Sequence, residues 1–180
     1  LIVMNALVIV DLQKDFCEGG ALPIKEGHKI VPVINSMLPQ FDIVFATKDW
    51  HPENTIHFDK WPVHCVRNTP GAEFHQDLYI NKIDHVLLKG TGNADDGYSA
   101  FEATNMDFLY ELRRRSVSKL YVCGLPSEYC IKSAVIDALN KDIPVSLICN
   151  AIAPVEKNEG DESKAINEMA AVGAEILDSI

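Results

Sequence analysis

Three side chains suited to nucleophilic chemistry each follow a short apolar run. Asp11 follows ALVIV, Lys89 follows VLL, and Cys130 lies in GLPSEYCIKS, a turn and helix start that comes after KLYVC. In open α/β sheets, ligands bind beyond the carboxyl ends of the strands. We therefore expect a carboxylate, an amine and a thiol to meet at one edge of a sheet.

The chemistry open to these groups is attack by a cysteine nucleophile. A free thiol has a pKa of about 8.5 and is mostly protonated at neutral pH. The helix start around Cys130 and the ammonium of Lys89 would both favour its thiolate. Asp11 could accept the thiol proton as a general base. Each residue alone has a plainer interpretation, as a buried hydrophobe, a surface charge or a turn residue, but their shared position favours a catalytic triad.

The segment ATKDWHPENTIHFDKWPVHC contains a second group of candidates. Asp49 and His51 are two residues apart and project to the same side of an extended chain, and His57 and His64 follow in the loop. A carboxylate with two or three imidazoles suits zinc, iron or manganese. So few protein ligands would leave room for a substrate atom. Scattered loop histidines remain the alternative on spacing alone.

Short apolar runs that alternate with helical patterns would position these residues. The strand candidates are Ala6–Val10, Ile43–Ala46, Val86–Leu88, Leu120–Cys123, Val145–Cys149 and a sixth near Ala174–Leu177. The helix candidates are Lys29–Leu38, Ala103–Arg114, Ser127–Asn140 and Asp161–Val172. This order predicts a three-layer α/β/α sandwich with a mostly parallel central sheet. We expect one domain over residues 1–180, with an irregular, functional insertion at about 49–84.

Composition excludes several classes of protein. The net charge of −10 argues against nucleic acid and anionic membrane surfaces as partners. No apolar run approaches the roughly 20 residues of a membrane span, and LIVMNALVIV lacks the basic start and cleavage site of a leader, so we expect a strand there. Five cysteines without a C-x-x-C pair suggest a reducing compartment and a cytoplasmic location.

Two other classes of function stay open at this point. A non-catalytic small-molecule or nucleotide-binding α/β domain is weakened because neither G-x-G-x-x-G nor a P-loop follows the first strand. A thiol redox protein is weakened by the lack of C-x-x-C, although Cys123 and Cys130 form a candidate pair.

Five motifs together resemble one family of enzymes. They are ALVIVDLQKDFCEGGAL, ATKDWHPENTIHF, WPVHCVRNTPGAEFH, KGTGNADDGYSAFE and VCGLPSEYCIKSAVIDAL, which cover nearly the whole chain. The chain resembles nicotinamidases, also called pyrazinamidases, of the isochorismatase-like cysteine hydrolase superfamily. WPVHC after DWH is the most specific block, because it separates metal-bearing nicotinamidases from metal-free relatives.

The resemblance implies a role for each matching residue. The implied catalytic triad is Asp11, Lys89 and Cys130. The implied metal ligands are Asp49, His51 and His64, with His57 as a further ligand found in some members. The implied ring pocket consists of Phe16, Trp61 and Tyr98, with Leu22 nearby.

The implied reaction is hydrolysis of nicotinamide to nicotinate and ammonia through a thioester on the cysteine, a step of NAD salvage. Pyrazinamide is an expected second substrate. One divalent metal ion, zinc by preference with iron or manganese as alternatives, would hold the ring nitrogen of the substrate. Another hydrolase of the superfamily that acts on a different small amide is the competing interpretation. Assembly into a homo-oligomer is left open.

Pro126 is the main departure from the family pattern. Family members have alanine there, after a cis peptide bond, and its N–H joins the cysteine N–H in the oxyanion hole. Proline suits a cis bond but has no N–H to donate. We therefore expect a hole formed by the Cys130 N–H with a substitute donor, either the Ser127 hydroxyl or a water.

Pro126→Ala is expected to keep or raise turnover, because alanine restores an N–H at that position. Loss of one oxyanion donor can lower a rate by about 10²–10³-fold. Ammonia release from nicotinamide measures the effect. A large fall in turnover with circular dichroism unchanged would contradict this account.

Overall fold

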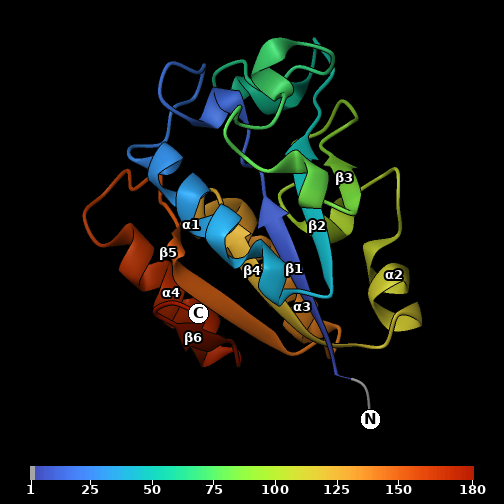
Figure 1. Cartoon of the computed structure of the whole chain (residues 1–180). Helices are drawn as coiled ribbons and strands as arrows, with labels where there is room; N and C mark the ends of the chain where they lie inside the picture. Colours follow the sequence, from blue (N-terminus) through green and yellow to red (C-terminus); the bar gives the residue numbers. More distant parts are fainter. Residues whose placement is uncertain (1–2) are drawn as a thin grey trace.

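Six parallel strands form the central sheet of the computed structural model, which describes residues 3–180 (Figure 1). The strands are Met4–Val10 (β1), Ile43–Asp49 (β2), His85–Lys89 (β3), Val117–Gly124 (β4), Val145–Ile152 (β5) and Glu175–Leu177 (β6). Their order in the sheet is β3-β2-β1-β4-β5-β6, and every neighbouring pair is parallel. All six predicted strands are therefore confirmed, and β1 lies at the centre.

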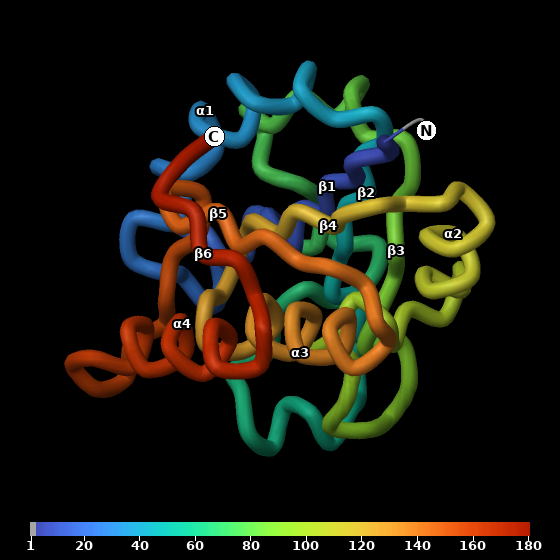
Figure 2. The backbone as a smooth tube through the Cα atoms, turned by 90° about the horizontal axis from the view of Figure 1, so that it is seen from below, coloured from blue at the N-terminus to red at the C-terminus, as the bar shows by residue number. Residues whose placement is uncertain are grey.

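Four helices cover the two faces of the sheet. They are Ile30–Met37 (α1), Phe108–Arg114 (α2), Lys132–Asn140 (α3) and Asp161–Ala171 (α4). Leu7 and Ile9 of β1 pack with α1, whereas Val8 and Val10 pack in the core formed with the other three helices. Figure 2 shows α1 on one side of the sheet and α3 and α4 on the other. The predicted three-layer architecture is confirmed.

Among residues 3–180, none of the helices has the length and apolar character of a membrane span.

Two helices differ from their predicted bounds by more than one residue. The predicted helix Ala103–Arg114 begins only at Phe108, because the Asp107 side chain accepts the Tyr110 N–H at 3.0 Å and caps it there. The predicted helix Ser127–Asn140 opens with a π-helical turn over Ser127–Ile131 before α3. In that turn the Pro126 carbonyl accepts the N–H five residues on, which widens the backbone at the nucleophile candidate.

The irregular insertion after β2 lies beyond the carboxyl ends of the strands (Figure 1). It contains short 3₁₀ turns at Ile56–Asp59, Pro70–Ala72 and Ile80–Lys82. Isolated bridges pair His51 with Val66 and Gln13 with Phe74. The insertion is thus anchored to the sheet and to itself, and it covers the edge where the candidate residues gather.

Leu112 is a test of the helix-to-sheet packing. It is fully buried in α2, so Leu112→Ala is expected to lower the free energy of unfolding by about 2–5 kcal/mol. Tyr110 of the same helix is 60% exposed, and Tyr110→Ala should change it by less than about 0.5 kcal/mol. Urea unfolding followed by circular dichroism compares the two. Equal losses would show that this face of α2 does not form the core.

Candidate active site

The carboxylate of Asp11 is fixed at the end of β1 by groups from β2 and β3. The Thr47 hydroxyl donates to Oδ1 at 2.6 Å, and the Lys89 ammonium donates to Oδ2 at 2.7 Å. The Asp11 N–H in turn contacts Thr47 Oγ1 at 3.1 Å. All three residues are fully buried, so the carboxylate has one well-defined orientation. Sequence reasoning missed Thr47, which no motif distinguishes from other strand residues.

Lys89 connects two buried carboxylates. Its ammonium donates to Asp11, to Asp49 Oδ1 at 2.6 Å and to the Gly97 carbonyl at 2.8 Å, which matches its three protons. Cys130 Sγ lies 3.5 Å from the same nitrogen. A buried ammonium requires such compensation, because an unpaired charge in the interior is strongly destabilising.

The thiol of Cys130 approaches both acidic residues. Its Sγ and one carboxylate oxygen each from Asp11 and Asp49 lie within 4.8 Å of one another. The π-helical turn after β4 presents the thiol here, while Asp11 and Lys89 come from β1 and β3. The structure therefore brings the three groups of the expected triad together.

Protonation at this cluster favours a neutral thiol at rest. Burial raises the pKa of Cys130 well above its ordinary value, Lys89 opposes this, and the two carboxylates add to it. The expected thiolate-favouring effects are therefore outweighed. Burial and the charge of Asp49 also raise the pKa of Asp11, which makes its carboxylate a stronger proton acceptor. The arrangement can therefore support proton transfer from the Cys130 thiol to Asp11.

Lys89 and Asp49 remain charged. Burial alone would lower the pKa of Lys89, but Asp11 and Asp49 raise it well above its ordinary value. Burial alone would raise the pKa of Asp49, but the ammonium of Lys89 holds it well below its ordinary range. Asp49 is thus a carboxylate available to a cation.

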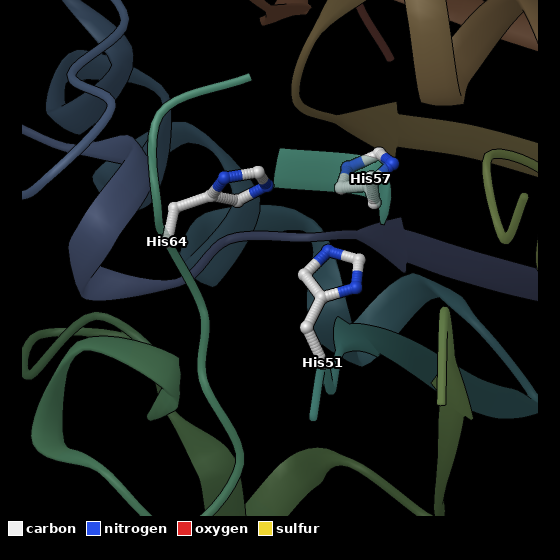
Figure 3. A group of neighbouring side chains, drawn as sticks. All are labelled: His51, His57 and His64. Carbon is white, nitrogen blue, oxygen red and sulfur yellow. The ribbon is translucent and has the colours of Figure 1, made fainter. Parts of the chain in front are cut away.

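Three histidines of the insertion surround a common space (Figure 3). Each Nδ1 is held by an oxygen acceptor: Gly90 O for His51 at 2.8 Å, Asp95 Oδ1 for His57 at 2.9 Å and Pro62 O for His64 at 2.6 Å. Carbonyl and carboxylate oxygens only accept, so we assign the proton to Nδ1 in each ring. Each Nε2 then carries a free lone pair.

The donor set of this space suits a zinc-type cation. One ring nitrogen from each of the three histidines lies within 4.8 Å of the others. Asp49 Oδ2 lies 3.4 Å from His51 Nε2 and 3.7 Å from His64 Nε2. His51 Nε2 is buried without a hydrogen-bond partner, which is unfavourable unless something else binds it. Burial and the nearby His51 lower the pKa of His57, so its ring is neutral as metal binding requires.

Gln13 holds Asp49 by its backbone. Its side chain accepts the Asp49 N–H at 2.9 Å and donates to the Asp49 carbonyl at 2.8 Å and the Ala72 carbonyl at 2.9 Å. Sequence reasoning missed this residue. Its place two residues after Asp11 gives no local signal, because the Asp11 backbone is left-handed (φ 49°) and the chain there is not extended.

A pocket beside Cys130 contains the expected ring-binding residues. Phe16, Leu22, Trp61 and Tyr98 all line it. Trp61 Nε1 donates to the Tyr98 hydroxyl at 3.0 Å. The pocket reaches Asp49, two of the histidines and the thiol, so one cavity connects the aromatic side chains to both groups of polar residues. Lining residues that the sequence did not reveal are Ile24, Asp96, Gly97, Tyr129 and Val155.

The geometry before the nucleophile differs from what the resemblance implied. No peptide bond within residues 3–180 is cis, so the expected cis bond at Pro126 is wrong; trans is the more stable isomer before proline by about 0.5–1 kcal/mol. The Ser127 hydroxyl, one of the two expected substitute donors, donates instead to Glu162 Oε2 at 2.7 Å. The Pro126 carbonyl accepts from Tyr129 and Ile131 but not from the Cys130 N–H between them.

The cysteines give no support to a redox pair. All five are free, including Cys123 and Cys130. Cys123 is fully buried in β4, and burial raises the pKa of its thiol.

Known proteins similar to this chain include nicotinamidases and a pyrazinamidase. A nicotinamidase of Escherichia coli (strain K12) is 35% identical, over 94% of this chain and 92% of that protein. The structure of a pyrazinamidase of Pyrococcus horikoshii in complex with zinc is 40% identical, with a TM-score of 0.87 over 96% of this chain and 98% of that one. A structure from L. infantum in complex with nicotinate is 30% identical, with a TM-score of 0.90 over 98% of this chain and 95% of that one.

The family model described as the isochorismatase domain matches residues 5–180. That match spans all but the first residue of the sheet, and it includes the insertion and every residue of the site. The chain belongs to the isochorismatase domain family.

Proposed function

We propose that this chain is a metal-dependent amidohydrolase that converts nicotinamide to nicotinate and ammonia, a step of NAD salvage, and that it also accepts pyrazinamide. The observation that carries the proposal is the buried Lys89 ammonium, which joins Asp11 and the Cys130 thiol to Asp49 of the histidine cluster. The relatives named nicotinamidase and pyrazinamidase, and the structure with nicotinate, support the substrate class.

A divalent metal, zinc by preference, would be held by Asp49, His51 and His64, with His57 as a further ligand. The pyrazinamidase structure that contains zinc supports this choice. When bound, the metal supplies Lewis acidity and an anchor for the ring nitrogen of the substrate. The aromatic side chains of Phe16, Trp61 and Tyr98 would enclose the ring and exclude water, which presents the carboxamide carbon to Sγ.

Acylation begins with proton transfer from Cys130 to Asp11. The sulfur then forms a bond to the carboxamide carbon, and the carbonyl electron pair moves onto oxygen. The Cys130 N–H, which does not donate to the Pro126 carbonyl, is the backbone donor suited to that oxyanion. When the carbonyl re-forms, the C–N bond breaks, and Asp11 returns the proton to the leaving nitrogen, which departs as ammonia.

Deacylation repeats this proton exchange with water. Asp11 takes a proton from a water molecule while the water oxygen forms a bond to the thioester carbon. The C–S bond then breaks, and the proton returns from Asp11 to the sulfur. Lys89 stays protonated throughout and offsets the negative charge that alternates between sulfur and carboxylate.

Cys130→Ala should lower the kcat for ammonia release from nicotinamide by at least about 10³-fold, because it removes the nucleophile. Cys149→Ala is the matched control, since that thiol lies in β5 and does not line the pocket. A discontinuous ammonia assay, with nicotinate identified by chromatography, measures both variants. Equal turnover by Cys130→Ala and wild type would remove the cysteine mechanism.

Removal of metal should lower kcat/KM for nicotinamide at least tenfold, because the ring would lose its anchor. Protein is dialysed against a chelator, its metal content is measured by atomic emission, and activity is assayed before and after zinc is restored. Recovery with zinc is the expected result. Full activity in protein shown to contain no metal would favour an amidase of the same family that works without one.

A further inference from the structure

The carboxylate of Asp95 lies between the histidine cluster and the aromatic wall of the pocket. A single oxygen, Oδ1, accepts from His57 Nδ1 at 2.9 Å and from the Tyr98 hydroxyl at 2.5 Å. The Tyr98 oxygen itself accepts from Trp61 Nε1 at 3.0 Å. A continuous chain of hydrogen bonds therefore runs from the indole to the imidazole.

At one end of this chain, Asp95 determines how His57 presents its ring. With Nδ1 donating to the carboxylate, the free Nε2 is left to the space shared with His51 and His64. The His57 ring is stacked against that of His51, with centroids 4.4 Å apart. A carboxylate on the far nitrogen of a histidine both fixes the ring and makes it a stronger ligand.

At the other end, the same oxygen fixes the pocket wall. Tyr98 has one hydroxyl proton and donates it to Asp95, so its oxygen is oriented to receive the Trp61 N–H. Both rings line the pocket. Lys60 is a further charged neighbour and lies 3.6 Å from Oδ2, with 58% of its side chain exposed. Such exposed ion pairs contribute little to stability.

We propose that Asp95 is a positioning residue that makes His57 an effective metal ligand. The same residue fixes the orientation of Tyr98 and, through it, of Trp61. One carboxylate then orders the side chains of both the metal site and the ring pocket, although it contacts neither metal nor substrate. This inference rests on the metal-binding part of the proposed function, and it assigns to the loop between β3 and α2 a role that the triad does not require.

The first test is zinc affinity, measured by competition with a chromophoric chelator. Asp95→Ala should raise the Kd for zinc by about 10–100-fold, as expected when the partner of a metal-binding histidine is lost. Asp59→Ala is the matched control, because it removes the same charge from the 3₁₀ turn of Ile56–Asp59 that carries His57. It should leave the Kd within about twofold.

The second test separates the hydrogen-bond chain from general stability. Asp95→Asn retains an acceptor oxygen and should give a Kd between those of wild type and Asp95→Ala. Tyr98→Phe keeps the ring and removes only the hydroxyl, so it should raise the Kd for zinc by about 3–10-fold. The visible absorption of the cobalt-loaded proteins reports the ligand set directly and should change in Asp95→Ala but not in Asp59→Ala.

Two outcomes would overturn the proposal. One is a wild-type Kd and cobalt spectrum in Asp95→Ala with the melting temperature of the metal-free protein unchanged. The other is an equal loss of zinc affinity in Asp95→Ala and Asp59→Ala, which would show that the effect comes only from the loss of one negative charge. Because these measurements use zinc and cobalt alone, they decide the role of Asp95 even if the wild-type protein fails to release ammonia from nicotinamide.

Discussion

The buried ammonium of Lys89 is the group on which the two halves of the site depend. It donates to Asp11 beside the thiol and to Asp49 beside the histidines, so one cation fixes both carboxylates. The two oxygens of Asp49 face different partners, Oδ1 the ammonium and Oδ2 the imidazoles. Without Lys89, two carboxylates would lie close together in a low-dielectric interior, where at least one of them would take up a proton.

Charge balance also explains why the thiol is neutral at rest. Asp11 and Asp49 already offset the ammonium, so a thiolate would add a further negative charge to a buried cluster. Moving the proton from sulfur to Asp11 keeps the total charge constant. Burial and the charge of Asp49 raise the pKa of both Cys130 and Asp11, so the carboxylate becomes a stronger proton acceptor beside a thiol that stays neutral. A base with a raised pKa and a buried thiol act as a pair and not as independent residues.

The second layer of the site comes from loops that the sheet edge brings together. Gln13 holds the backbone of Asp49, and Asp95 holds His57 and Tyr98. Gln13 reaches β2 and Asp95 reaches His57, and both partners are distant in the sequence. Gln13 restrains Asp49 through its backbone and Asp95 restrains His57 through its ring, and both contacts exist only in the folded chain.

The sequence by itself determined the sheet, most helices and the identity of the chemical groups, because apolar runs and polar residues at their ends are local patterns. It could not place the start of α2, which an Asp107 cap decided, or the π-helical turn before α3. It misjudged the peptide bond at Pro126, and it did not reveal that the Ser127 hydroxyl donates to Glu162. Only the tertiary structure decided the partners of Gln13 and Thr47 and the contact of Asp95 with His57, because these hydrogen bonds join residues at least 36 positions apart. Spacing along a chain carries no information about such contacts.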